Sequence, residues 1–191
     1  MPPADAVRRT GTSARNKRIL VLLVAIAIAP VLLAYLAYYA WPRDARVNYG
    51  ELLSGTLPTI TGARLDGTPF RSDALRGRWS VLYVAAGDCA GDCPAALYAS
   101  RQARTIQNAE RERVVRVWLV TGGPAPPARL LAEHPDLAVV RVDVPPELPR
   151  GIHRIYLVDP LGNFVLAWPS KPDIKAMAKD LGRVLRASSI G

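Results

Sequence analysis

The sequence predicts an α/β fold in which helices flank a central mixed sheet, preceded by one transmembrane helix. Three observations support this prediction. A span without charged residues lies near the start of the chain, strand-length apolar runs alternate with helical segments after it, and both cysteines lie between the first long run and the helix that follows. The 191 residues suffice for one domain plus an extra segment.

The span from Ile19 to Trp41 contains no charged residue. At about 1.5 Å rise per residue, a helix of this length crosses a hydrocarbon core of about 30 Å. A cleaved signal peptide would have an apolar region of only about 7 to 15 residues and a small-x-small cleavage site, so we expect a retained anchor. Aromatic residues gather toward its end like an interfacial belt: Tyr35, Tyr38, Tyr39 and Trp41.

The charges beside this span predict its orientation. The leader, residues 1–18, carries one acid, Asp5, against five cations: Arg8, Arg9, Arg15, Lys17 and Arg18. The positive-inside rule therefore places the leader in the cytoplasm and everything after the anchor, residues 19–41, outside. The Arg- and Ala-rich composition indicates a bacterium. We thus expect an inner-membrane protein whose periplasmic domain, residues 57–191, follows a linker over residues 42–56.

The formal net charge of +9 arises partly from the leader. The remaining cations are spread along the chain without a basic run interleaved with aromatic residues, so we expect no nucleic-acid partner. The sequence also has no Ser-His-Asp order, no paired catalytic carboxylates and no phosphate-binding glycine loop. We therefore expect no small-molecule substrate.

The segments after the linker have a clear order. ARLDGTPF predicts a hairpin with its turn at Asp66-Gly67. Buried strands are predicted over residues 79–86, 114–121 and 137–143, a helix over 94–113, a short helix over 128–134, a strand–turn–strand unit over 155–168 and a final helix from residue 172. This order, with a cysteine pair between the first long strand and its helix, predicts a thioredoxin-like topology. Binding sites in open α/β sheets form at the carboxyl ends of the strands, and the cysteine pair follows the carboxyl end of the first long strand.

The two cysteines, Cys89 and Cys93, form a C-x-x-x-C motif, one residue longer than the redox C-x-x-C motif. The longer loop lets two thiolates face one point, and Cys93, just before Pro94, lies at the positive end of a helix that stabilises its thiolate. Paired thiolates select soft ions such as Cu(I). A purely structural disulfide is the alternative, but so short a loop would stabilise the fold by less than about 3 kcal/mol.

The run DGTPFRSDALRGRWSVLYVAAGDCAGDCPAAL and the later IYLVDPLGNFV resemble the Sco/SenC proteins. That family consists of membrane-anchored thioredoxin-fold proteins with a C-x-x-x-C-P motif that take part in assembling the copper site of cytochrome c oxidase. The resemblance implies copper, as Cu(I) or Cu(II), held by Cys89 and Cys93, and a partner in the oxidase subunit that carries a copper site. The family has an Asp-Pro where this chain has TGGPAPP.

The family's third copper ligand is a histidine just before the late strand. The chain has two histidines, and His153 is the candidate, although it lies two residues after the family's usual position, which is Gly151 here. A shift of two residues keeps the same face of a strand. An ordinary structural role is the alternative for His153. His134 we expect at an exposed helix end, and not as a ligand.

Three functions remain open from the sequence. The first is a metallochaperone that binds copper through Cys89, Cys93 and His153 and is not an enzyme. The second is a thiol-disulfide oxidoreductase that keeps the copper-ligand cysteines of the oxidase reduced, with Cys89 as the attacking thiol. The third is an assembly scaffold whose cysteines are incidental. The first two need the same two thiolates, so the motif alone does not separate them.

Overall fold

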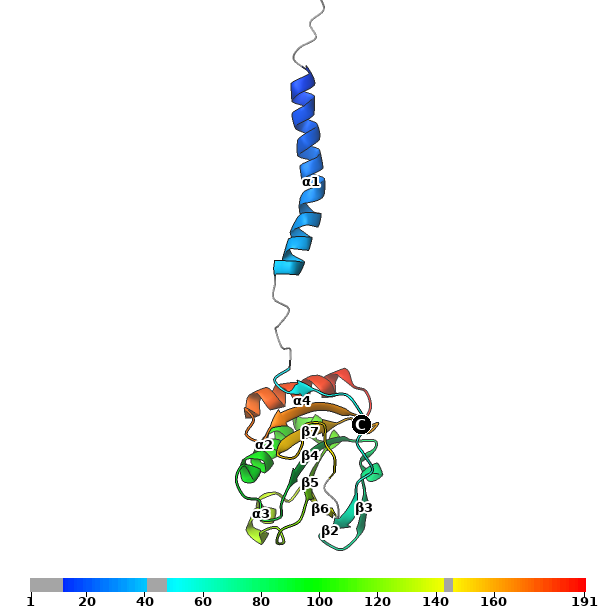
Figure 1. Cartoon of the computed structure of the whole chain (residues 1–191), viewed down its shortest axis with the longest axis vertical. Helices are drawn as coiled ribbons and strands as arrows, with labels where there is room; N and C mark the ends of the chain where they lie inside the picture. Colours follow the sequence, from blue (N-terminus) through cyan, green and yellow to red (C-terminus); the bar gives the residue numbers. More distant parts are fainter. Residues whose placement is uncertain (1–11, 41–47, 143–145) are drawn as a thin grey trace, which may run out of the picture. The chain divides into compact units, whose positions relative to one another are not determined.

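The computed structural model describes residues 12–40, 48–142 and 146–191. The chain divides into two compact units, Met1–Arg46 and Val47–Gly191. The described part of the first is one helix, α1 (Thr12–Ala40), with Pro30 inside it (Figure 1). Within α1, Asn16–Ala37 is long enough to cross a membrane and contains an 18-residue window with a mean hydropathy of 3.0, consistent with an anchor. Trp41 and the arginines Arg8 and Arg9 lie outside the described residues.

The second unit is built on one eight-stranded sheet. Its strands are β1 (Glu51–Leu52), β2 (Thr61–Arg64), β3 (Pro69–Arg71), β4 (Trp79–Ala85), β5 (Val114–Val120), β6 (Leu137–Val142), β7 (Arg154–Val158) and β8 (Phe164–Pro169). They lie in the order β1-β8-β7-β4-β5-β6-β2-β3. The pairs β4–β5 and β5–β6 are parallel and the others antiparallel, which confirms the predicted mixed sheet.

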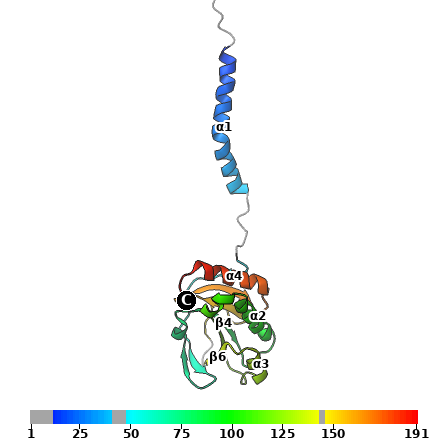
Figure 2. The same ribbon diagram turned by 180° about the vertical axis from the view of Figure 1, so that it is seen from behind.

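The helices are α2 (Cys93–Thr105), α3 (Ala128–Glu133) and α4 (Ile174–Ala187), with short 3₁₀ helices η1 (Ser72–Leu75) and η2 (Asn108–Arg113). Figures 1 and 2 show α2 and α4 side by side against the sheet, and the two helices contact each other. The apolar side chains form two cores. Val81 and Tyr83 of β4 belong to the core beneath α2 and α4, whereas Leu82 and Val84 belong to the other. Alternation along a strand explains this division.

The second core is covered by the segment that precedes β4. Ile60, Phe70 and Leu75 contribute to it from the β2–β3 hairpin and its flanks. The hairpin turn lies at Asp66-Gly67, as predicted, and the Asp66 carboxylate accepts hydrogen bonds from the backbone and side chain of Thr68. Every residue of β4 is buried, because both faces of this strand are covered.

The helix predicted over residues 94–113 is wrong in its second half. α2 ends at Thr105, and residues 108–113 form η2. The break has a local cause, since Asn108 has a φ of 53°, in the left-handed region that ends helices. The amide of Gln107 then donates hydrogen bonds to the carbonyls of Ala103 in α2 and Ala178 in α4, joining the two helices at this point.

The folded unit begins earlier than the predicted boundary at Leu57. Strand β1 pairs with β8, and the buried carboxylate of Asp180 accepts hydrogen bonds from the backbone N–H groups of Tyr49 and Gly50 and from Nε1 of Trp168. A Cβ at Gly50 would lie 2.6 Å from the indole nitrogen of Trp168. Part of the expected linker is therefore folded. Tyr49 and Gly50 satisfy a buried charge of α4 that sequence patterns do not reveal, and Glu51–Leu52 pair with β8.

Two buried tyrosines allow a matched test of how much a buried hydroxyl hydrogen bond stabilises the folded unit. The hydroxyl of Tyr156 donates to the carbonyl of Gly151 at 2.6 Å and accepts from the N–H of Arg150, whereas that of Tyr83 has no hydrogen-bond partner among the described residues. Tyr156→Phe should lower the free energy of unfolding by about 1 kcal/mol, and Tyr83→Phe should leave it unchanged or raise it. Chemical denaturation of the full chain in detergent measures both. A larger loss of stability in Tyr83→Phe than in Tyr156→Phe would contradict the hydrogen bonding described for the two hydroxyls.

Candidate functional site

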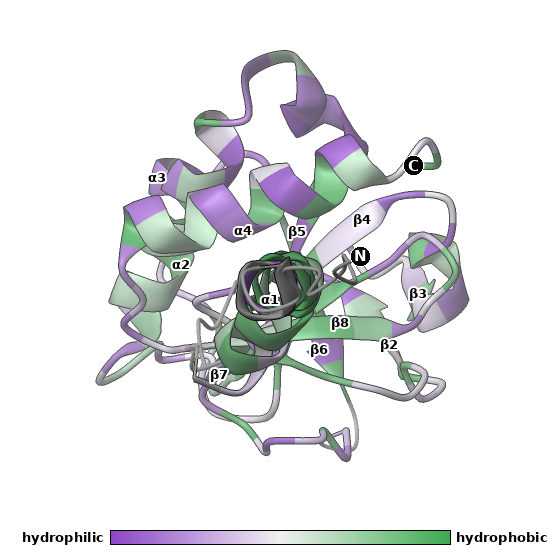
Figure 3. Ribbon diagram, turned by 90° about the horizontal axis from the view of Figure 1, so that it is seen from above, coloured by the Kyte–Doolittle hydropathy of each residue, from purple (hydrophilic) through white to green (hydrophobic). Residues whose placement is uncertain are grey.

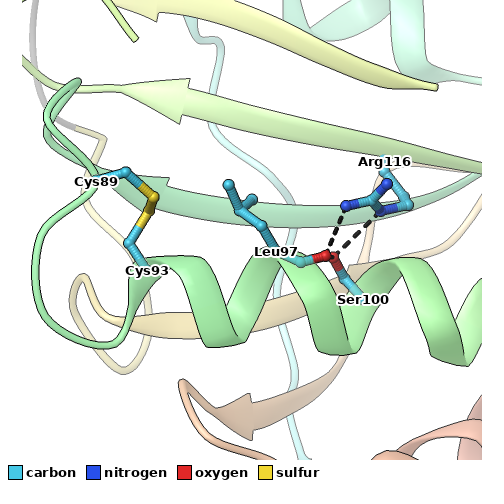
Figure 4. Close-up of a disulfide and its surroundings, with 5 residues drawn as sticks. All are labelled: Cys89, Cys93, Leu97, Ser100 and Arg116. Atoms are coloured by element: carbon cyan, nitrogen blue, oxygen red, sulfur yellow. Dashed lines mark hydrogen bonds between the residues drawn. A yellow bond between two sulfur atoms is a disulfide. The ribbon is translucent and has the colours of Figure 1, made fainter. Parts of the chain in front are cut away.

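The candidate site is the loop between β4 and α2, where the two cysteines meet. Cys89 lies in the loop and Cys93 is the first residue of α2; they form a disulfide with a Cα–Cα distance of 5.1 Å (Figure 4). Both residues are buried, with exposed fractions of 4% for Cys89 and 1% for Cys93. They belong to the core beneath α2 and α4, so the disulfide is packed on its inner side by the sheet.

Two successive turns shape this loop. The N–H of Cys89 donates to the carbonyl of Ala86 and that of Cys93 to the carbonyl of Ala90. Cys89 has a φ of 49° and Gly91 a φ of 63°, both in the left-handed region. A glycine adopts this region freely, whereas a cysteine does so at a cost. The turns reverse the chain at the end of β4 and bring both cysteines to the first turn of α2.

A second loop, which follows β5, packs against the first. The N–H of Gly87 donates to the carbonyl of Gly122 at 3.0 Å. A Cβ at Gly87 would lie 1.9 Å from the carbonyl oxygen of Pro124, so only glycine fits there. The TGGPAPP segment, which differs from the Asp-Pro of the Sco proteins, therefore forms one wall of the cysteine loop.

Asp92 links the site to the segment between β8 and α4. Its carboxylate pairs with Nζ of Lys171 at 2.7 Å and accepts a hydrogen bond from the hydroxyl of Ser170 at 2.9 Å. These hydrogen bonds are the main reason why the pKa of Asp92 lies below its usual value. Its partners are distant along the chain, so no local pattern indicated the ion pair.

His153 lies just before β7, at the end of the sheet where β4 leads into the cysteine loop. Strand β7 pairs with β4, with Ile155 opposite Tyr83, so His153 follows the register toward the end of β4 that leads into the cysteine loop. Its side chain is exposed and its φ is 67°. Within residues 12–40, 48–142 and 146–191, no group of three or more His, Cys, Asp or Glu side chains is placed to hold a metal ion. The structure thus joins the two cysteines, and His153 as third ligand stays a prediction.

His134 lies at a helix end, as expected, but the prediction that it is exposed is wrong. It follows α3 and has an exposed fraction of 4%. Burial, and next the charge of Arg116, lower the pKa of this imidazole. The charges of Arg116 and Asp136 both act on this imidazole, and it is not among the residues of the cysteine loop.

The ion pair between Arg116 and Asp136 was not identified from the sequence. The buried guanidinium of Arg116 donates to the Leu97 carbonyl and the Ser100 hydroxyl (Figure 4). It also donates to the Asp136 carboxylate. Burial lowers the pKa of Arg116 to about 10, so the group stays charged at neutral pH. Burial alone would raise the pKa of Asp136, but Arg116 holds it below its usual value. The one available signal was a single charge inside the apolar run VVRVWLV.

The geometry defines what the site can do chemically. A cysteine at a helix N-terminus has a stabilised thiolate, because the helix dipole and the free N–H groups favour negative charge. A Cα–Cα distance of 5.1 Å is within the range of disulfides, so the same two sulfurs can cycle between a disulfide and a dithiol. In the reduced form both are soft donors at one position, a donor set that fits Cu(I).

A model of the family described as transmembrane-like, thioredoxin-like, C-terminal domain matches residues 79–188. The chain belongs to this family. The match runs from the start of β4 to the end of α4 and so contains both cysteines and His153. The predicted thioredoxin-like fold is therefore confirmed. A search of the curated proteins gave no match.

Solved structures of Sco proteins share this fold. Copper-bound ScoI from Bradyrhizobium japonicum is 18% identical, with a TM-score of 0.53, over 68% of this chain and 99% of that one. Copper-bound ScoI from Arabidopsis thaliana is 18% identical, with a TM-score of 0.56, over 70% and 100%. Yeast Sco1 is 16% identical, with a TM-score of 0.57, over 70% and 99%. At this level of identity the likeness establishes a common fold.

The contact between the two loops gives a testable prediction. Gly87→Ala should lower the free energy of unfolding by about 1 to 3 kcal/mol, because the added methyl group would overlap the Pro124 carbonyl. Gly91→Ala is the matched control, since the space beside Gly91 is open and only its positive φ carries a cost, of about 1 kcal/mol. Denaturation curves of the oxidised proteins measure both. Equal losses in the two variants would show that the loops do not depend on each other.

Proposed function

We propose that this protein is a membrane-anchored copper-binding protein that assists assembly of the copper site of cytochrome c oxidase. One observation carries the proposal: the only two cysteines of the chain meet at the N-terminus of α2, in a fold shared with Sco structures that contain copper. The folded unit acts in the bacterial periplasm, anchored to the inner membrane by α1. Its partner is the oxidase subunit that carries a copper site.

In this proposal the reduced thiolates of Cys89 and Cys93 bind one copper ion as cargo. Two thiolates satisfy Cu(I), which accepts low coordination numbers and soft ligands. The imidazole of His153 joins them for Cu(II), because a nitrogen donor suits the harder oxidised ion better. His153 lies in an exposed segment next to the cysteine loop, so its side chain has room to turn toward the sulfurs once the disulfide opens.

The disulfide itself favours a second candidate function, reduction of the copper-ligand cysteines of the oxidase. The Cys89 thiolate would attack a disulfide of the partner, forming a mixed disulfide and releasing one thiolate. The Cys93 thiolate would then attack the sulfur of Cys89, releasing the second. The partner gains two electrons, the pair returns to the disulfide, and an external dithiol reductant regenerates it. Cys89 takes the first step as the amino-terminal member of the pair, since it lies in the loop whereas Cys93 is fixed in the first turn of α2.

Copper titration of the reduced full chain separates the two functions. We expect about one Cu(I) per chain, measured by competition with a chromogenic chelator, and loss of binding in Cys93→Ser, because one thiolate rarely holds a soft ion against competing ligands. A reductase would bind copper poorly and would exchange disulfides rapidly with a partner peptide. Tight binding by the Cys89→Ser/Cys93→Ser variant would contradict both functions and leave an assembly scaffold.

The role of His153 is tested separately. His153→Ala should weaken Cu(II) binding and change its sulfur-to-copper charge-transfer absorption, while Cu(I) binding stays nearly intact. His134→Ala is the matched control, since that histidine is buried beside Arg116 and should affect thermal stability only. An unchanged Cu(II) spectrum in His153→Ala would remove His153 from the site and leave the two cysteines as the only ligands.

A further inference from the structure

Helix α4 carries a stripe of exposed cations, which we call the basic stripe: Lys175, Lys179 and Arg186. Residues four and seven positions apart lie on one face of a helix, so the three side chains project in the same direction. The only acidic residue within α4 is Asp180, which is buried. Figure 3 shows hydrophilic positions alternating with apolar ones along α4. The outer face of this helix is therefore positive, without an acidic neighbour on the same helix.

The chain arriving from the anchor attaches to this same helix. The Arg183 guanidinium donates to the side chain of Asn48 at 2.6 Å, the Asp180 carboxylate accepts from the N–H groups of Tyr49 and Gly50, and the N–H of Asp173 donates to the Tyr49 hydroxyl. These contacts hold residues 48–50 on α4. Only residues 41–47 separate them from the end of α1. An extended chain of that length spans at most about 30 Å, which limits how far α4 can move from the membrane.

We propose that the basic stripe of α4 binds anionic lipid headgroups of the membrane that α1 spans. Cations near an anionic surface are attracted to it, each strengthening binding by about fivefold. Because the connection to α1 is short, binding of the stripe to the bilayer is an intramolecular event, so a weak electrostatic attraction suffices to orient the folded unit. The proposal depends on α1 being a membrane anchor and not on the identity of the metal or the redox partner.

Lipid binding by the basic stripe has a consequence for the cysteine site. The segment just before α4 holds Lys171, whose ammonium pairs with Asp92 beside Cys93. The start of α4 and the start of α2 are thus joined by an ion pair of 2.7 Å. A folded unit that rests on its α4 face presents the disulfide loop close to the membrane surface. A membrane-bound partner also exposes residues near the membrane surface, where they lie close to its own transmembrane segments.

The test uses the full chain in lipid nanodiscs that contain a paramagnetic headgroup lipid. One set is made of phosphatidylcholine alone and the other contains about 30% phosphatidylglycerol, a composition chosen to give a negative surface. We expect the NMR signals of α4 amides at residues 175–186 to be broadened at least fivefold more in the anionic discs. The difference should disappear near 1 M salt, where electrostatic attraction is screened within about 3 Å.

Two variants with the same change in total charge make the test specific. Lys175→Glu/Lys179→Glu should abolish the additional broadening, whereas Arg71→Glu/Arg129→Glu, on β3 and α3, should retain it. Both replace exposed cations. If the glutamate variant of α4 unfolds, Lys175→Gln/Lys179→Gln replaces it. Equal broadening in both lipid compositions, or equal loss of the additional broadening in both variants, would overturn the proposal. Copper binding by the α4 variants should be unchanged, which keeps this test independent of the proposed function.

Discussion

The complete burial of strand β4 is the constraint on which the rest of the structure depends. Its two faces pack against two different cores, and it pairs with β5 on one side and β7 on the other. This central position determines where the chain can turn. The cysteine loop must leave from the end of β4, α2 must return over one face, and the segment before β7 must arrive beside the same end. The site is thus a product of strand order, and its chemistry is set by what the loop carries.

Sequence patterns predicted the fold well because the long strands are continuous apolar runs and the hairpin has an Asp-Gly turn. They predicted the cysteine pair because its loop is local. They did not reveal what depends on distant packing. Arg116 and Asp136 are 20 residues apart in the chain and form an ion pair, and both act on the buried His134. The early start of the folded unit has the same origin, since Gly50 is held by Asp180. A third ligand from His153 depends on loop conformation, which no periodicity encodes.

The proposed functions and the burial of the disulfide are linked. The core surrounds both sulfurs, so neither a metal ion nor a partner thiol reaches them freely while the bond is closed. Reduction has to come first, and the loop then gains the freedom to expose its thiolates. The wall formed by the TGGPAPP segment and the ion pair between Asp92 and Lys171 both border this loop, so they influence how far it can open. Copper carriage and disulfide reduction therefore share one preceding step, and they differ in what meets the thiolates afterwards.

The buried guanidinium of Arg116 also has an evolutionary consequence. It serves three acceptors on two segments, the Leu97 carbonyl and the Ser100 hydroxyl on α2 and the Asp136 carboxylate before β6. Loss of the arginine alone would leave a partly buried carboxylate unpaired, and loss of the aspartate alone would leave a buried cation unpaired. Each change would cost several kcal/mol of stability. Replacement of the whole group by well-packed apolar residues avoids both penalties. Across related chains, positions 100, 116 and 136 should therefore vary as a set, with few sequences that keep only part of it.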